Sequence, residues 1–195
     1  MSIVQLLVAT AVGYLAGSVS TATIVASRRG VDLRSIGSGN PGATNVGRAL
    51  GRRTGIAVAL LDVLKGLLPA AGFGMLDHRA GLVAGVAAVV GHVTSPFLRG
   101  RGGRGVATAA GAVIGSHPLW APVVLLVWVV VVAASRWVAL ASISAALSIL
   151  VLALVAGEDL VWALALAGIV IGRHQPNLAR RLERRRPPPL GTEEA

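Results

Sequence analysis

The sequence predicts an all-α protein, a polytopic bundle whose apolar helices cross a membrane several times. Hydrophobic residues make up 54% of the chain and charged residues 13%, whereas soluble domains carry about 25% charged residues. The mean hydropathy is +0.75, and runs such as Val106 to Ser135 contain no charged side chain apart from a histidine. Runs of this length are typical of membrane spans. We expect one membrane domain over residues 1–182 and a disordered, Arg- and Pro-rich tail over residues 183–195.

Seven apolar segments are predicted to form the spans of the bundle. They are Ile3–Val25, Gly55–Leu76, Ala80–Val93, Gly105–Ser116, Leu119–Ala134, Val138–Ala156 and Leu160–Gly172. The third, fourth and seventh reach only about 20 Å as helices, against a hydrocarbon core of about 30 Å. Non-helical backbone at membrane depth is tolerated where it is buried in protein or lines a wet cavity. We therefore expect a cleft beside the three short segments.

The charge distribution predicts the orientation of the bundle. Sixteen of the 18 Lys and Arg residues follow the first, third, fifth and seventh segments. Cytoplasmic loops collect Lys and Arg, so the N-terminus is expected outside and the C-terminus in the cytoplasm. Because the positive charge lies at the ends of spans, the formal net charge of +10 indicates topology, and no nucleic-acid partner is expected.

The first cytoplasmic connection contains the stretch GSGNPGATN, residues 37–45. Its glycines would let backbone N–H groups approach an anion closely, as in phosphate-binding loops. It is not a Walker A motif, because no lysine follows at the required position. The alternative interpretation is a plain turn capped by Ser and Thr.

A second motif, GHVTSPFLRGRGGRGVAT, covers residues 91–108. Gly100, Gly102 and Gly105 match G-x-G-x-x-G, but without a preceding strand they do not indicate a dinucleotide site. Gly102 and Gly103 beside Arg104, at the start of a short helix, suit an anion. In the alternative interpretation, the arginines only mark this connection as cytoplasmic. That would explain the arginines but not the glycines.

The third motif, GRHQPNLARRLERRR, covers residues 172–186. His174 and Asn177 would share a helical face, although Pro176 between them suggests a turn or a helix start. Elsewhere, Ser142 is expected to form an interhelical hydrogen bond. Asp62 and Lys65 either neutralise each other inside the second span or have a functional role.

The predicted topology brings the three motifs and Ser142 to the cytoplasmic side. They would form one basic, glycine-lined cleft that binds a phosphorylated cytosolic molecule beside the lipid. The chain has no Cys, which excludes thiolate catalysis, disulfides and Cys-ligated metal. No metal site is predicted.

The motifs GSGNPGATNVGRALG, LDVLKG, GH, GGRGVAT and H-x-x-N resemble the bacterial acyl-phosphate:glycerol-3-phosphate acyltransferases of the PlsY type, over residues 1 to about 182. The resemblance implies a seven-helix inner-membrane enzyme with a cytoplasmic active site. Such an enzyme moves a fatty acyl group from acyl phosphate to the 1-hydroxyl of glycerol 3-phosphate, giving lysophosphatidic acid and inorganic phosphate. It implies no metal or other cofactor; besides the two substrates and membrane lipid, an acyl-phosphate-producing enzyme is an expected partner.

The resemblance also assigns roles to residues. It places Ser38, Arg48, Arg104, Ser142, His174 and Asn177 in the glycerol 3-phosphate pocket, with Ser38, Arg48, Arg104 and His174 as catalytic candidates. It assigns acyl-phosphate and further substrate binding to Gly39, Asn40, Gly42, Thr44, Asn45, His92, Gly102 and Gly103. This chain departs from the family pattern at Ser95, Gly100 and Arg104, where the family has Pro, an aromatic residue and Lys.

Two other functions stay open from the sequence. A degenerate member of the family could bind or carry a phosphorylated lipid precursor, or acylate a different phosphorylated acceptor. A small-solute transporter would need polar or broken helices reaching both faces, and the plain outer connections do not favour it.

Overall fold

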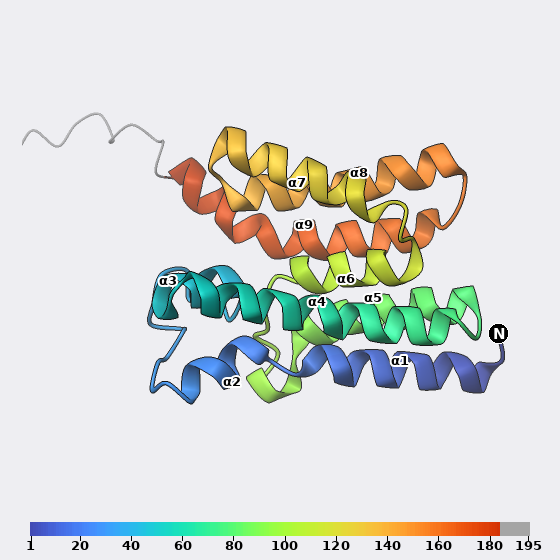
Figure 1. Ribbon diagram of the computed structural model, residues 1–195, viewed down its shortest axis with the longest axis horizontal. Helices are drawn as coiled ribbons and strands as arrows, with labels where there is room; N and C mark the ends of the chain where they lie inside the picture. The colour runs from blue at the N-terminus through green and yellow to red at the C-terminus, as the bar shows by residue number, and fades with distance from the viewer. Residues whose placement is uncertain (184–195) are drawn as a thin grey trace, which may run out of the picture.

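The computed structural model describes residues 1–183, which form helices and contain no strand (Figure 1). The elements are α1 (Ile3–Ser18), α2 (Thr21–Ser27), α3 (Ala43–Leu50), α4 (Arg52–Gly74), α5 (His78–Thr94), the 3₁₀ turn η1 (Pro96–Leu98), α6 (Val106–Ser116), α7 (Ala121–Ser135), α8 (Val138–Ala156) and α9 (Leu160–Glu183). Residues 184–195 of the tail that we expected to be disordered lie outside the described residues. Glu183 is the last residue of α9.

Four stretches of the described residues are long and apolar enough to cross a membrane. They are Ile3–Ser27, Arg52–Gly74, His78–Leu98 and Val138–Ala156, and Val106–Ser116 and Ala121–Ser135 are shorter apolar helices. Large apolar side chains cover the outside of the bundle, with Leu68 and Leu154 each 64% exposed. An apolar exterior of this kind fits contact with lipid. The all-helical membrane fold predicted from composition is confirmed.

Two pairs of helices in the bundle meet through glycines. A Cβ built at Gly17 of α1 would fall on the carbonyl oxygen of Ala88 in α5, and one at Gly66 of α4 would fall on the carbonyl oxygen of Thr108 in α6. Small residues let helix backbones approach closely inside a membrane, where the hydrophobic effect gives little drive for association. The pairs α1 with α5 and α4 with α6 therefore pack backbone against backbone.

This packing predicts a stability difference between two glycines of the same helix. Gly66→Ala should lower the free energy of unfolding by about 1–3 kcal/mol, because the added methyl overpacks the α4–α6 contact. Gly72→Ala should leave stability unchanged or slightly raised, because nothing lies within 4 Å of a Cβ built there. Thermal unfolding of both variants in detergent measures the difference. Equal melting temperatures would contradict the close contact.

The first predicted segment is wrong as a continuous helix, because Val19 and Ser20 interrupt it. The break frees backbone carbonyls at membrane depth, which must find donors inside the protein. Lys65 Nζ donates to the Val19 carbonyl at 2.9 Å and Ser95 Oγ donates to the Ser18 carbonyl at 2.6 Å. The break is therefore closed by side chains from α4 and from the end of α5.

The Asp62–Lys65 pair supports the same break. Lys65 Nζ lies 3.0 Å from Asp62 Oδ1, and both side chains are buried. Asp62 Oδ1 also accepts a hydrogen bond of 2.6 Å from Thr21 Oγ1 at the start of α2. Breaking a buried pair leaves an uncompensated charge, which makes each partner hard to replace singly. The structure thus gives this pair a bracing role at the α1–α2 junction.

Three other helices, α3, α5 and α9, differ from the prediction. Residues 43–50 form α3 where we expected only a loop. α5 has 17 residues and begins at His78, because the Asp77 side chain caps it by accepting from the Ala80 N–H. α9 runs for 24 residues through Pro176, so the turn or helix start expected there is wrong. Only the segment at α6, which has 11 residues, is as short as predicted.

Candidate active site

The glycine-rich connection before α3 is held in place by the side chain of Asn45. Asn45 is 1% exposed. Its Nδ2 donates to the carbonyls of Leu33 and Ile36, both at 3.0 Å, and its Oδ1 accepts from the Ser38 N–H at 3.2 Å. All of these bonds lie within the connection, so Asn45 positions the loop and the structure gives it no open face for a substrate.

The backbone donors of this loop are distributed differently from the prediction. The Gly39 N–H donates to Ile36 and the Gly42 N–H donates to Asn40. Both are therefore satisfied within the loop and do not point to a ligand. No side chain caps the N-terminus of α3 at Gly42, and helix N-termini attract anions. The part of this motif whose backbone N–H groups suit an anion is thus the first turn of α3, where Thr44 is exposed.

Ser38 and Arg48 flank this loop. Ser38 is half-buried and Arg48 is exposed, in the last turn of α3. The Cδ atom of Arg48 would lie 3.8 Å from a Cβ built at Gly37, so the arginine side chain extends back along the glycine-rich stretch. Asn40 lies close to Gly42, with its Nδ2 2.8 Å from a Cβ built there. Arg48 therefore lies beside the start of the glycine-rich stretch, and Asn40 lies beside its end at Gly42.

Gly102 and Gly103 are fixed between α5 and α9. Their N–H groups donate to the carbonyls of Val93 and His92, each at 3.1 Å. Their carbonyls accept from Arg173, at 3.0 Å for Gly102 and 3.2 Å for Gly103. A Cβ on Gly103 would fall on His92 Nε2. The glycines are needed for this close packing, and Arg173, which the sequence analysis did not select, is the residue that holds them.

Arg104 joins the second motif to the third. Its Nη2 donates to Asn177 Oδ1 of α9 at 2.8 Å, and the guanidinium is half-buried. His174, one turn before Asn177 and 1% exposed, lies within electrostatic reach of Arg104. Its Nδ1 bonds to the Val170 carbonyl at 2.8 Å, and a carbonyl accepts only from a protonated nitrogen, which leaves Nε2 as the free ring position. The continuation of α9 through Pro176 is what places His174 and Asn177 on one helix.

Further contacts bind these parts together. Arg34 Nη2 donates to the Arg101 carbonyl at 3.0 Å, which links the first connection to the second. His92, 8% exposed, lies within electrostatic reach of Lys65 and Arg173. Figure 1 shows α3 and the end of α9 at the same end of the molecule, opposite the N-terminus. The structure thus gathers Arg104, Arg173, His174 and Asn177 into one cluster, with the α3 loop at the same end.

Ser142 has another role in the structure. It is 1% exposed. Its Oγ donates to the Val138 carbonyl at 2.8 Å and accepts from Trp128 Nε1 of α7 at 3.4 Å. The interhelical hydrogen bond predicted for Ser142 is confirmed. Within the described residues, no hydrogen bond joins it to Arg104, His174 or Asn177.

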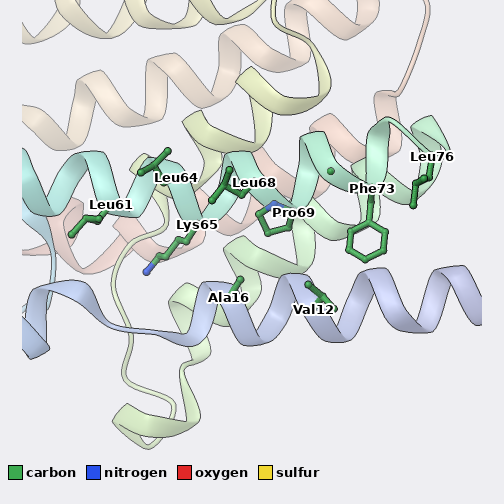
Figure 2. A pocket seen from close by; sticks show the side chains of 10 residues that line it. Val12, Ala16, Leu61, Leu64, Lys65, Leu68, Pro69, Phe73 and Leu76 are labelled. Atoms are coloured by element: carbon green, nitrogen blue, oxygen red, sulfur yellow. The ribbon is translucent and has the colours of Figure 1, made fainter.

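An apolar groove of about 590 Å³ runs between α1 and α4 (Figure 2). Its lining residues are Val12, Ala16, Leu61, Leu64, Lys65, Leu68, Pro69, Gly72, Phe73 and Leu76. Lys65 is the only charged one, and its carbon chain lies along the groove. Lys65 donates to the Val19 carbonyl, and Ser95 at the end of α5 donates to the adjacent Ser18 carbonyl. The end of α5 also holds Gly102 and Gly103, so this part of the groove lies near the second motif. An apolar groove near this motif suits an amphipathic molecule with an anionic head.

Comparison with known proteins gives one consistent result. A family model described as glycerol-3-phosphate acyltransferase matches residues 7–184. The glycerol-3-phosphate acyltransferase of Aquifex aeolicus is 42% identical over 176 residues, which is 87% of this chain and 91% of the relative. That of Geobacter sulfurreducens is 44% identical over 180 residues, or 89% and 92%.

Two solved structures have a similar fold. The crystal structure of PlsY, an integral membrane glycerol 3-phosphate acyltransferase, in its glycerol 3-phosphate form has a TM-score of 0.88 and 39% identity, covering 93% of this chain and 94% of that one. The lysophosphatidic acid form has a TM-score of 0.85 and 38% identity over the same shares. The likeness extends over nearly all of the described residues.

Proposed function

This chain belongs to the glycerol-3-phosphate acyltransferase family, and we propose that it transfers a fatty acyl group from acyl phosphate to the 1-hydroxyl of glycerol 3-phosphate. It is an acyltransferase that acts on glycerol 3-phosphate. The donor and the attacked position are our proposals. The observation that carries them is the cluster of Arg104, Arg173, His174 and Asn177 beside an apolar groove.

The proposed reaction requires little from the protein beyond binding and aligning the two substrates. An acyl phosphate is a mixed anhydride and is already activated. The hydroxyl oxygen of glycerol 3-phosphate forms a bond to the acyl carbonyl carbon, and the bond from that carbon to the phosphate oxygen breaks. Lysophosphatidic acid and inorganic phosphate leave. Both substrates are anions, so the arginines supply the binding energy and neutralise the charge that develops on the leaving phosphate.

We assign the roles as follows. Arg48 and Arg104 hold substrate phosphates, Ser38 binds beside Arg48, and Asn177 orients Arg104 through the bond at 2.8 Å. The first turn of α3, with Gly42 and Thr44, receives the phosphate group of the acyl phosphate. The hydroxyl proton passes either to His174 Nε2 or to the phosphate of glycerol 3-phosphate itself. Arg173 acts as a positioning residue through Gly102 and Gly103.

Phosphate release tests the proposal. Purified protein should release inorganic phosphate from palmitoyl phosphate only when glycerol 3-phosphate is present, with lysophosphatidic acid formed in equal amount. Release without the acceptor would indicate a hydrolase. Binding of both compounds without any release would favour a carrier on this scaffold.

The groove is the proposed site of the acyl chain, which leads to a prediction on chain length. Ala16→Phe should narrow the groove, because Ala16 lines it from the α1 side. We expect kcat/KM to fall at least about tenfold for palmitoyl phosphate and much less for octanoyl phosphate. Leu15→Phe is the matched control, since Leu15 is 58% exposed on the same helix and does not line the groove. Equal losses for both chain lengths would place the acyl chain elsewhere.

We further propose seven spans in the bacterial inner membrane, with the active site facing the cytoplasm. The N-terminus and the end of α9 lie at opposite ends of the long axis (Figure 1), as an odd number of spans requires. A reporter fused to the C-terminus should be cytoplasmic and one fused to the N-terminus external, following the charge asymmetry. Two reporters on the same side would indicate an even number of spans.

A further inference from the structure

Three connections meet at the end of the bundle opposite the candidate active site. His78 is the first residue of α5, His117 follows α6, and Asp159 precedes α9. Figure 1 shows the connections before α5, after α6 and before α9 at the end where the N-terminus lies. Within the part of the chain that the structure describes, their ion pairs and ring contacts are with one another and with Glu158, Trp120 and Trp162. They have no part in acyl transfer as proposed above.

Their nitrogen and oxygen atoms converge on one point. His78 Nε2 lies 2.6 Å from Asp159 Oδ2, and His117 Nε2 lies 3.0 Å from the same oxygen. The three ligand atoms all lie within 4.8 Å of one another. A tetrahedral zinc ion with bonds of about 2.1 Å keeps its ligand atoms roughly 3.4 Å apart. The two distances to the Asp159 oxygen are shorter than that value by less than 1 Å, so small side-chain movements would suffice to hold an ion.

The environment of His117 favours a ligand there. Its side chain is 6% exposed, and the ring stacks on Trp120 with centroids 4.0 Å apart. Although Nε2 is close to Asp159, the pair lacks hydrogen-bond geometry, and both ring nitrogens are buried without a hydrogen-bond partner. A buried nitrogen without a partner carries a desolvation cost. A metal ion at Nε2 would remove that cost for this atom.

The backbone also positions the carboxylate. Asp159 has φ +51, a left-handed conformation that is uncommon for residues other than glycine. The preceding residue brings a second carboxylate, with Glu158 Oε1 3.9 Å from His117 Nε2. The site therefore offers two imidazoles and one carboxylate at close range. A second carboxylate, that of Glu158, lies nearby.

We propose that His78, His117 and Asp159 form a zinc site that ties together the three connections at this end of the bundle. Two imidazole nitrogens and one carboxylate oxygen match the ligand types of zinc, whereas Mg²⁺ and Ca²⁺ prefer oxygen ligands alone. Water or Glu158 completes the coordination. An ion held by three separate connections stabilises the folded bundle, since the unfolded chain does not bring its ligands together.

The test uses the full chain in detergent, purified without a histidine tag and treated with EDTA. Zinc chloride is titrated by calorimetry, bound zinc is counted by mass spectrometry, and thermal unfolding is followed with and without the ion. We expect one zinc per protein and a melting temperature several degrees higher with zinc. His78→Gln and Asp159→Asn should weaken binding at least about tenfold and abolish the thermal shift. His78 is 54% exposed, so its replacement does not disturb the buried packing.

Asp77→Asn is the matched control. Asp77 precedes His78, but its carboxylate pairs with the N-terminal amine at 3.2 Å, and asparagine also caps helices. This variant should keep the zinc binding of the parent. A parent without saturable binding would show that Asp159 only pairs with the two histidines and holds no ion, and unchanged binding in both His78→Gln and Asp159→Asn would place the ion elsewhere. Either result overturns the proposal.

Discussion

Replacement of Gly39 by leucine is expected to reduce acyl transfer by roughly a hundredfold or more, while the protein still inserts and folds. Gly39 has φ +66, and a Cβ built there would lie 3.1 Å from the Arg34 carbonyl oxygen. A side chain in the left-handed conformation costs about 1–2 kcal/mol, which a folded domain tolerates. The loop between Ile36 and α3 would shift, and displacement of a binding group by about 1 Å can cost about 100-fold in rate.

Gly30→Leu is the control for this experiment. Gly30 lies in the same connection with φ +68, and nothing lies within 4 Å of a Cβ built there. It carries the same conformational cost but lies outside the glycine-rich stretch of residues 37–45. Phosphate release and thermal unfolding should be measured for both variants. If the two lose activity equally, the loss reflects backbone strain in general, and the loop before α3 is only a turn.

The sequence predicted the membrane class and most apolar segments because both depend on local composition. It missed the break at Val19 and Ser20, although the run of Ser and Thr around it was a local signal, and Ser20 caps α2 by accepting from the Thr23 N–H. The break depends on Lys65 and Ser95, which lie far away in sequence and supply the missing donors. Helix α3 was missed for a related reason. Its sequence contains glycine and asparagine, and it is stabilised by burial of Val46 against its neighbours.

The motifs predicted which residues belong to the candidate site, but not the contacts that these residues make. The motifs predicted a basic, glycine-rich site, and the bond between Arg104 and Asn177 joins two of the motifs. The motifs did not reveal that the N–H groups of Gly102 and Gly103 bond to the end of α5, or that Arg173 holds their carbonyls. The cluster of His78, His117 and Asp159 was also missed. Each of these residues stands alone in a short connection, and only the folded bundle brings them together.

Arg104→Ala is expected to lower kcat/KM at least about tenfold, because it removes a charge-assisted contact to a substrate phosphate worth on the order of 1.5–3 kcal/mol. Arg101→Ala is the matched control, since Arg101 is exposed in the same connection and should contribute to topology alone. Asn177→Ala removes one hydrogen-bond partner of the guanidinium. It should cause a smaller loss, because the charge stays while one constraint on its orientation is removed.

Arg104→Lys then tests which phosphorylated acceptor the pocket binds. Lysine keeps the charge but lacks the planar fork that bonds to Asn177. If the pocket is shaped for glycerol 3-phosphate, the lysine variant should equal or exceed the parent. If the pocket is shaped for another phosphorylated acceptor, the variant should be worse. Phosphate release by Arg104→Ala at the rate of the parent would contradict both outcomes, since the bond to Asn177 would then serve only to join α9 to the second connection.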